Sequence, residues 1–387
     1  AICADYLKIN MKEEIVMKKI LLVLLVLCMV LSLVACGTKP AAEEPAAEEP
    51  AAEEPVAEAG DEMQSLKLAS HNAALSGNPY RIRYEADVKE ALEDAKNYGY
   101  DISYASFVAE WDPAVEQQLL ENSINEGYDI LLVNPVSNSG IDPLIDKAVE
   151  AGIKMIFADI PYMSERTLNV GADQYEFGYE SATFVGETLG AGTKVILINA
   201  IEGNIANDWR EDGFDAAIEE QGLEVVGKYN HQWDATTAVN VMTEIINSGV
   251  EFDAILTSQL AESIMTAYDT TGADLPKAIA FGDVAQYGQK MLEINKDEEV
   301  LSYLFMSNPP GVGAIALNFG LNEMMGEEIR EDVITQYDGF KMVRIPSRLS
   351  FTYEDQEEYR DMIEAMAPSD AVTYWLTVDE VKAEFFK

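Results

Sequence analysis

Residues 129–159 of the chain read DILLVNPVSNSGIDPLIDKAVEAGIKMIFAD. Two short apolar runs, at 129–135 and 154–159, flank a segment at 141–151 with a helical pattern of apolar residues. Gly152 directly follows that segment and suits the carboxyl cap of a helix. A strand, a helix and a second strand at this spacing predict a βαβ unit, in which the strands pair in parallel through a right-handed crossover.

The same alternation extends to both sides of this unit. Before it, the pattern predicts strands at 66–70 and 101–106 and helices at 84–98 and 113–126. After it come strands at 170–173, 194–199, 223–229, 253–258 and 277–282, helices at 175–189, 208–220, 235–247 and 261–270, and a strand–helix unit at 300–325. So many strands favour two sheets over one, so we predict an α/β fold of two doubly wound parallel-sheet lobes.

The amino-terminal segment has the pattern of an export signal. A short basic segment begins at Met17, and residues 20–35 form an apolar run of about sixteen residues, shorter than the roughly 20 that span a bilayer. The run ends in Leu-Val-Ala-Cys at 33–36, which resembles the lipobox of bacterial lipoproteins. That resemblance implies lipidation of Cys36 and cleavage before it. An uncleaved membrane anchor and a buried cysteine are the alternatives.

Residues 1–35 are thus predicted to be an upstream extension and a signal peptide, and 36–64 a tether. The tether contains AAEEP three times over 41–55, and proline at every fifth residue prevents a regular helix. Two of the three cysteines, Cys3 and Cys28, precede Cys36. No internal disulfide is therefore expected, and the fold must depend on its apolar core.

The composition excludes several kinds of function. The chain has 69 acidic and 26 basic residues, a net charge of −43, whereas nucleic-acid binding needs a basic surface. Anionic lipid would also repel the chain, so acyl chains would have to anchor it. With only His71 and His231, histidine-based triads and metal clusters are not expected. We therefore predict no catalytic residue, no metal and no cofactor, although paired carboxylates leave a glycosidase-type enzyme as a distant alternative.

Several motifs resemble those of a known family. Asn134-Pro135, the Ala-Gly-Ile-Lys at 151–154 and the strand ending in Asp159 are similar to the ribose/galactose type of periplasmic binding protein. Further matching segments follow in order at 170–174, 210–214, 233–234, 282–283 and 308–310. The resemblance covers about residues 66–350. It implies a type I periplasmic binding protein fold, whose lobes, 65–172 with 308–345 and 173–307 with 346–387, are joined by a multi-crossover hinge.

In open α/β sheets, ligands bind beyond the carboxyl ends of the strands. Asp159 and Asp283 each end a strand, and carboxylates accept hydrogen bonds from the paired hydroxyls of a sugar. The resemblance implies that both carboxylates contact ligand. Gln259 stands where the family commonly has a ligand-binding asparagine at a strand end, and Ser307 and Asn308 occupy the last hinge crossing. The resemblance makes these three residues ligand-binding candidates as well.

Aromatic side chains can pack on the C–H faces of a sugar ring. The resemblance assigns Asn78 to hydrogen bonding and Tyr80 to stacking from the first lobe, and Trp233 to stacking from the second. The family usually has arginine after the position of Asp159, where this chain has Ile160. Arg81 either supplies that missing donor or is an ordinary surface arginine.

Asp208 stands where the family often has a ligand-binding arginine, and Arg210 lies two residues further on. Two residues along a helix correspond to about 200°, so these side chains leave the helix in nearly opposite directions. Either Arg210 replaces the family's contact or that contact differs.

Taken together, the resemblance implies a monomeric solute-binding lipoprotein on the extracytoplasmic side of the cell membrane. It would capture a small polar ligand, most readily a monosaccharide, and deliver it to an ABC permease with its ATPase. A tethered ectodomain for signalling is the alternative role. A nucleoside, an autoinducer or a polyol is the alternative ligand.

Overall fold

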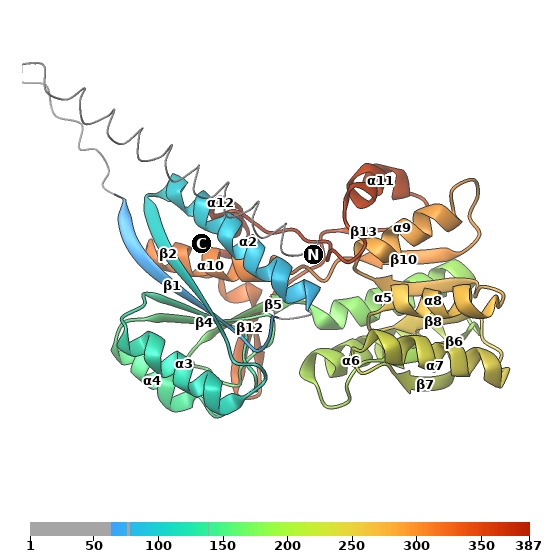
Figure 1. The fold of residues 1–387 in the computed structure, drawn as a ribbon, viewed down its shortest axis with the longest axis horizontal. Helices are drawn as coiled ribbons and strands as arrows, with labels where there is room; N and C mark the ends of the chain where they lie inside the picture. Colours follow the sequence, from blue (N-terminus) through green and yellow to red (C-terminus); the bar gives the residue numbers. More distant parts are fainter. Residues whose placement is uncertain (1–62, 76–77, 138) are drawn as a thin grey trace, which may run out of the picture. The chain divides into compact units, whose positions relative to one another are not determined.

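The computed structural model describes residues 63–75, 78–137 and 139–387. The predicted extension and signal peptide, Cys36 and the tether up to residue 62 lie outside the described residues. Within them the chain forms two α/β lobes, each built on its own sheet (Figure 1). The predicted fold class is confirmed.

The first sheet combines the earliest strands of the chain with two late ones. Within the described ranges it has seven strands in the order β11-β12-β5-β4-β3-β1-β2. Their bounds are β1 Gln64–Asn72, β2 Tyr100–Val108, β3 Ile130–Val133, β4 Lys154–Ala158, β5 Leu168–Ala172, β11 Ile334–Tyr337 and β12 Phe340–Ile345. All neighbours are parallel except β11 and β12, so β1 to β5 end at one edge of the sheet.

Helices cover both faces of this sheet (Figure 1). One face packs on α2 (Pro79–Ala95), α10 (Val312–Met324) and α12 (Val378–Phe385), and the other on α3 (Pro113–Asn125) and α4 (Asp142–Glu150). Short 3-10 turns occupy Lys96–Tyr98 and Glu331–Val333. A central strand such as β3 is buried on both faces, which is why its sequence, ILLV, is continuously apolar.

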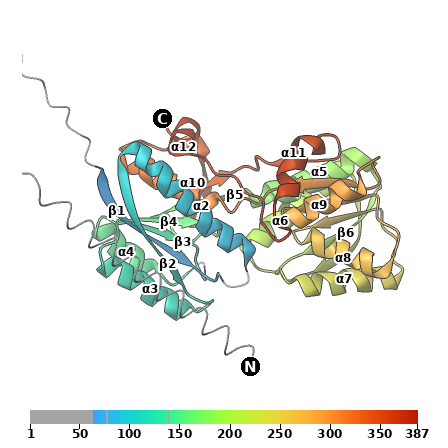
Figure 2. The ribbon, with the colours of Figure 1, turned by 45° about the horizontal axis from the view of Figure 1, so that its top comes forward.

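The second sheet has six strands in the described part of the chain, in the order β13-β10-β9-β8-β6-β7. Their bounds are β6 Lys194–Asn199, β7 Glu224–Asn230, β8 Ala254–Thr257, β9 Ala278–Gly282, β10 Ser302–Met306 and β13 Ser350–Phe351. The helices α5 (Gln174–Leu189) and α6 (Ile205–Gln221) cover one face. The helices α7 (Ala235–Ser248), α8 (Ala261–Thr271), α9 (Ala285–Ile294) and α11 (Gln356–Ala365) cover the other (Figure 2).

The carboxyl-terminal segment corrects one predicted boundary. Residues 346–387 were assigned to the second lobe, but the segment after α11 returns to the first, where Val378 and Phe385 are buried. Figures 1 and 2 show α12 beside α10. Because α10 is buried along residues 312–322, its outer side needs a cover, which α12 provides. The side-chain amide of Asn318 donates to the Leu376 carbonyl across this contact at 2.7 Å.

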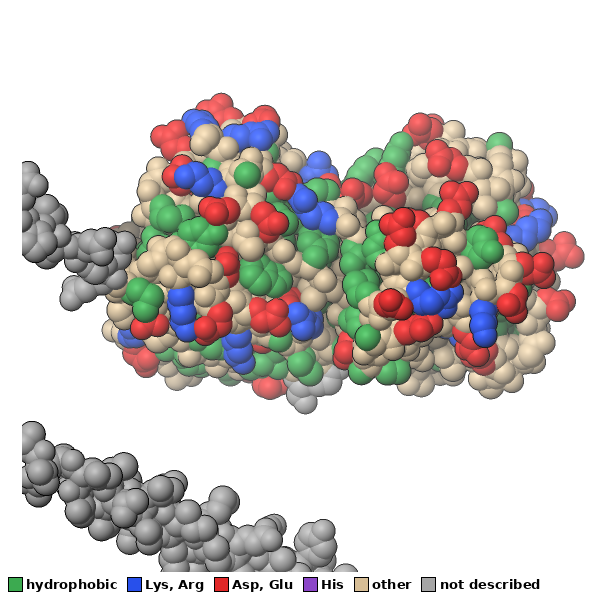
Figure 3. Space-filling view, turned by 90° about the horizontal axis from the view of Figure 1, so that it is seen from above, with side chains coloured by type: hydrophobic (Ala, Val, Ile, Leu, Met, Phe, Trp, Pro, Cys, Tyr) green, Lys and Arg blue, Asp and Glu red, His purple; other side chains and the backbone are tan. Residues whose placement is uncertain are grey.

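The start of α2 is the second difference from the predicted elements. The apolar pattern predicts a helix from 84, whereas α2 begins at Pro79. Proline is favoured in the first helical position, and the Asn78 side chain caps the helix by accepting from the Arg81 backbone N–H at 3.1 Å. Tyr80 and Arg81 therefore lie on the first turn of a helix and not in a loop. Acidic side chains are spread over both lobes on the face shown in Figure 3, as the net charge implies.

Candidate ligand-binding site

The first lobe gathers polar side chains at the carboxyl end of β4. Asp159 follows this strand with a φ of 75°, a left-handed conformation that is uncommon for residues other than glycine. Gly171 makes room for it, because a Cβ on Gly171 would lie 2.7 Å from the Asp159 carbonyl oxygen. Strained backbone of this kind is concentrated at functional sites.

Three side chains converge on the Asp159 carboxylate. An Arg81 guanidinium nitrogen lies 2.5 Å from Oδ2, and the Tyr80 hydroxyl donates to Oδ1 at 3.0 Å. Asn134, at the end of β3, donates to Oδ2 at 3.3 Å. Arg81 is only 7% exposed, so it is not a surface arginine. It supplies the positive charge beside Asp159 that Ile160 does not.

The polar side chains of the first lobe differ in whether they have an atom left to bond to a ligand. The side-chain oxygen of Asn78 is already engaged in capping α2. By contrast, the second guanidinium nitrogen of Arg81 and the side-chain oxygen of Asn134 are buried without a hydrogen-bond partner. Buried polar atoms rarely lack partners. These two atoms are therefore available for ligand hydroxyls.

The second lobe has a corresponding cluster around Asp283. Gln259 follows β8 and donates to Asp283 Oδ2 at 2.7 Å, while Asp283 Oδ1 is buried without a partner. Burial raises the pKa of Asp283 to about 6, although the nearby Arg210 charge opposes that shift. The cluster thus offers one free carboxylate oxygen, Asp283 Oδ1, while the Gln259 amide binds the other.

Arg210 lies on α6 and is 2% exposed. It donates to the Gln174 side-chain oxygen at 2.8 Å and to the Ser258 carbonyl, and its guanidinium lies 5.5 Å from the Phe177 ring. Burial lowers the pKa of Arg210, and the charge of Asp283 and, from the first lobe, that of Asp159 oppose this. The two clusters are therefore within electrostatic reach of one another at Arg210.

The two candidate side chains on α6 differ in their partners within the protein. Asp208 accepts a hydrogen bond from the Gly203 backbone N–H at 3.1 Å, in the exposed turn before α6. Arg210 instead lies in the buried cluster. The structure therefore brings Arg210, and not Asp208, to Asp283.

Trp233 lies in the turn between β7 and α7, and its φ of 51° is left-handed. Its backbone N–H donates to His231 Nδ1 at 3.0 Å, and its indole N–H is buried without a partner. Ser307 and Asn308 follow β10 in the hinge. The Ser307 hydroxyl donates a hydrogen bond to the Val372 carbonyl, and the Asn308 side-chain oxygen accepts one from the Gln174 amide at 3.5 Å.

Four residues of these clusters were not predicted from the sequence, namely Asn134, Gln174, Ser258 and Glu262. Asn134 and Gln174 belong to the family-like motifs, so the sequence contained a signal for them. Glu262, at the start of α8, had none. Its Oε2 is buried without a partner, and burial together with the Asp283 charge raises the pKa of Glu262 to about 7.

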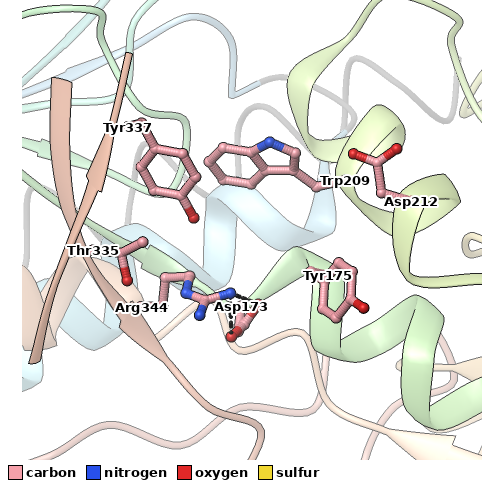
Figure 4. Close-up of a pocket in the computed structure, with 7 residues that line it drawn as sticks. All are labelled: Asp173, Tyr175, Trp209, Asp212, Thr335, Tyr337 and Arg344. Carbon is pink, nitrogen blue, oxygen red and sulfur yellow. Dashed lines mark hydrogen bonds and ion pairs between the residues drawn. The ribbon is translucent and has the colours of Figure 1, made fainter. Parts of the chain in front are cut away.

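A cavity of about 290 Å³ lies elsewhere, between α5, α6 and the β11–β12 hairpin (Figure 4). Trp209 stacks there on Tyr337 with ring centroids 5.0 Å apart, and Arg344 pairs with Asp173 at 3.1 Å. None of the predicted ligand residues lines it. In this cavity Arg344 and Asp173 already pair with each other. The carboxyl ends of the strands, by contrast, hold buried polar atoms that have no hydrogen-bond partner. We therefore place the candidate site at the strand ends.

Two further features of the described chain concern other functions. Among the residues that the structure describes, no three histidine, cysteine or acidic side chains are grouped so as to hold a metal ion. In that same part of the chain, no helix has both the length and the apolar character needed to cross a membrane.

Comparison with known proteins links these features to a family. Residues 73–328 match the family described as periplasmic binding protein domain. A ribose import binding protein of Bacillus subtilis is 23% identical over 259 residues, covering 66% of this chain and 81% of that protein. The D-allose-binding periplasmic protein of Escherichia coli is 23% identical over 274 residues, covering 67% and 86%.

Solved structures share the fold. An ABC transporter solute-binding protein of Bacillus halodurans with bound myo-inositol has a TM-score of 0.61 and 23% identity, covering 78% of this chain and 99% of that one. A periplasmic solute-binding protein of Actinobacillus succinogenes with bound D-allose has a TM-score of 0.62 and 22% identity, covering 76% and 100%. At these identities the likeness establishes the two-lobed architecture.

Proposed function

The chain belongs to the periplasmic binding protein family, and from this premise we propose that it captures a small cyclic polyol, most readily a monosaccharide, between its lobes. The family is a class of extracytoplasmic solute-binding proteins. The relatives bind ribose and D-allose, and the solved structures hold myo-inositol and D-allose. These ligands share a ring that carries several hydroxyl groups.

One observation carries the proposal. Each lobe presents a carboxylate at a strand end, partly buried in Asp159 and buried in Asp283, next to buried polar atoms that have no partner in the protein. In the first lobe these are atoms of Arg81 and Asn134 around Asp159, and in the second they are Asp283 Oδ1 and the Trp233 indole N–H. Ligand hydroxyls can satisfy both sets together only when the lobes close, so ligand favours the closed form.

Delivery and anchoring complete the proposal. The closed form is handed to an ABC permease with its ATPase, as the names of the similar solved structures suggest. Acyl chains on Cys36 keep the monomer at the extracytoplasmic surface of the membrane. Replacing Cys36 with Ser should therefore move the protein from the membrane fraction to the soluble fraction. Equal membrane association of both forms would argue against the anchor.

A thermal-shift screen of the purified protein against D-ribose, D-allose, myo-inositol and nucleosides tests the ligand. A compound that binds only the folded protein stabilises it by about 2.7 kcal/mol at a hundredfold excess over its Kd. We expect a shift with a sugar or cyclitol that is lost in Asp159→Ala and Trp233→Ala. A shift with nucleosides alone would overturn the sugar assignment and leave the fold intact.

A further inference from the structure

Trp111 is an exposed aromatic residue at the same edge of the first sheet as the candidate site. It lies in the turn 109–112 between β2 and α3, and 61% of its surface is exposed. Asp112, which follows it, caps α3 by accepting from the Ala114 backbone N–H at 2.8 Å. The turn therefore has a defined conformation, and the indole is not part of the apolar core.

The backbone of this turn is strained and tied to the site. Glu110 and Trp111 have φ values of 50° and 62°, two successive left-handed residues that are not glycine. The Trp111 N–H donates to the Ala73 carbonyl at 2.9 Å. Ala73 directly follows β1, in the connection between β1 and α2, the helix that carries Tyr80. Strain that the surroundings hold in place is typical of functional sites.

The second lobe repeats this arrangement around Trp233. Gln232 and Trp233 have φ values of 57° and 51°, and Asp234 caps α7 by accepting from the Thr237 backbone N–H at 2.7 Å. Both turns follow the edge strand next to the first strand of their sheet, β2 beside β1 and β7 beside β6. Trp111 and Trp233 thus occupy equivalent positions in the two lobes.

We infer that Trp111 forms an outer subsite that receives a second ring or an apolar substituent attached to the sugar held at Asp159. This inference rests on the proposed function. Neighbouring strands lie about 4.8 Å apart, so in the order β4-β3-β1-β2 the ends of β4 and β2 are about 14 Å apart. A ligand that contacts both Asp159 and Trp111 therefore extends beyond one sugar ring. Glycosides and disaccharides have this form, and an indole packs well on the C–H face of their second ring.

The test compares each free sugar with its extended form. D-ribose, D-allose and their phenyl β-glycosides are titrated calorimetrically into the full-length protein and into Trp111→Ala, Trp111→Phe and Val149→Ala. Val149, on α4, is 58% exposed and lies at the opposite end of the strands, so it serves as the control. The melting temperature of each unliganded variant checks that it is folded.

Trp111→Ala should weaken the binding of a phenyl glycoside about tenfold and leave the free sugar within about twofold. Trp111→Phe should retain most of the affinity, and Val149→Ala all of it. Equal affinities of Trp111→Ala and the unaltered protein for the glycoside would overturn the subsite and favour a role of this indole in docking to a permease. If the unaltered protein binds free sugars but no glycoside, the subsite falls and the proposed function stands. If it binds none of these sugars or glycosides and the thermal-shift screen finds no other sugar or cyclitol, both fall.

Discussion

Asp159 holds the first-lobe cluster together, so its removal should reduce both the stability of the protein and its affinity for sugar. Arg81 is 7% exposed and has its carboxylate partner at 2.5 Å, so Asp159→Ala leaves a buried positive charge unpaired. We expect a loss of about 3–5 kcal/mol in the free energy of unfolding, measured in urea, together with loss of sugar binding. The double variant Asp159→Leu/Arg81→Met should recover stability but not binding.

An exposed ion pair provides the control. Glu121 pairs with Lys147 at 2.5 Å, with both side chains about half exposed. Glu121→Ala should cost less than about 1 kcal/mol, because solvent screens exposed pairs. If Asp159→Ala were as mild as Glu121→Ala, the Arg81 pair could not be the buried centre of the first-lobe cluster.

The second-lobe carboxyls make stability depend on pH. In the folded protein, burial raises the pKa of Glu262 from 4.5 to about 7 and that of Asp283 from 3.8 to about 6. Between about pH 4 and pH 7 the unfolded chain therefore loses protons that the folded chain keeps, so these groups make stability fall as pH rises. Glu262→Gln removes one of them, and its free energy of unfolding should fall less than that of the unaltered protein from pH 5 to pH 8.

The difference between variant and unaltered protein is the quantity to measure, because the histidines act in the opposite direction. Burial lowers the pKa of His71 to about 3 and that of His231 to about 4, so their contribution to stability increases with pH up to about 6.5. The exposed Glu251→Gln is the matched control. Parallel curves for Glu262→Gln and Glu251→Gln would contradict a raised pKa of Glu262 in the folded protein.

At the scale of elements, two glycines, Gly178 on α5 and Gly213 on α6, let these helices cross closely enough to position Arg210. A Cβ on Gly178 would lie 1.9 Å from the Arg210 carbonyl oxygen, a contact with backbone that no side-chain rotation relieves. Gly178→Ala must therefore push α6 away. We expect a loss of about 3 kcal/mol in the free energy of unfolding and a large loss of ligand affinity.

Gly320→Ala on α10 is the control. Its added Cβ would lie 2.7 Å from Ile156 Cδ1, the far end of a side chain that can shift, and 3.7 Å from Lys154 Cγ. Its loss of stability should be smaller, and its ligand affinity should be unchanged. Equal effects of the two alanines, measured by urea unfolding and calorimetry, would show that the close crossing does not position Arg210.

The elements that the sequence predicts well are those with strong periodicity. Strands such as β3 are continuously apolar, and α7 starts at Ala235 as its pattern indicates. The start of α2 was missed because Pro79 to Arg81 lack an apolar stripe and their signal is the Asn78 cap. The return of α12 to the first lobe could not be predicted from local sequence. It depends on a tertiary contact, because α12 buries the outer side of α10. The sequence motifs select candidate site residues such as Asp159 and Asp283, whereas Glu262 becomes a candidate only through its buried Oε2 beside Asp283.

At the scale of the whole molecule, the division of the proposed site between two lobes predicts how binding and closure are linked. Asp159 and Tyr80 belong to the first lobe, and Asp283 and Trp233 to the second. A ligand can shift the open–closed equilibrium only by its difference in affinity between the two forms, and that difference comes from the lobe it meets last. Ligand that contacts one lobe alone therefore cannot drive closure.

Small-angle X-ray scattering with and without the sugar found in the thermal-shift screen tests this link. The unaltered protein should contract when the sugar is added. Asp283→Ala removes the second-lobe carboxylate and leaves the first-lobe cluster intact, so it should bind the sugar more weakly and contract less, even at saturation. Contraction equal to that of the unaltered protein would show that Asp283 does not bridge the lobes. Tight binding by the unaltered protein without contraction would mean that one lobe holds the whole site, because a ligand shared between the lobes must draw them together.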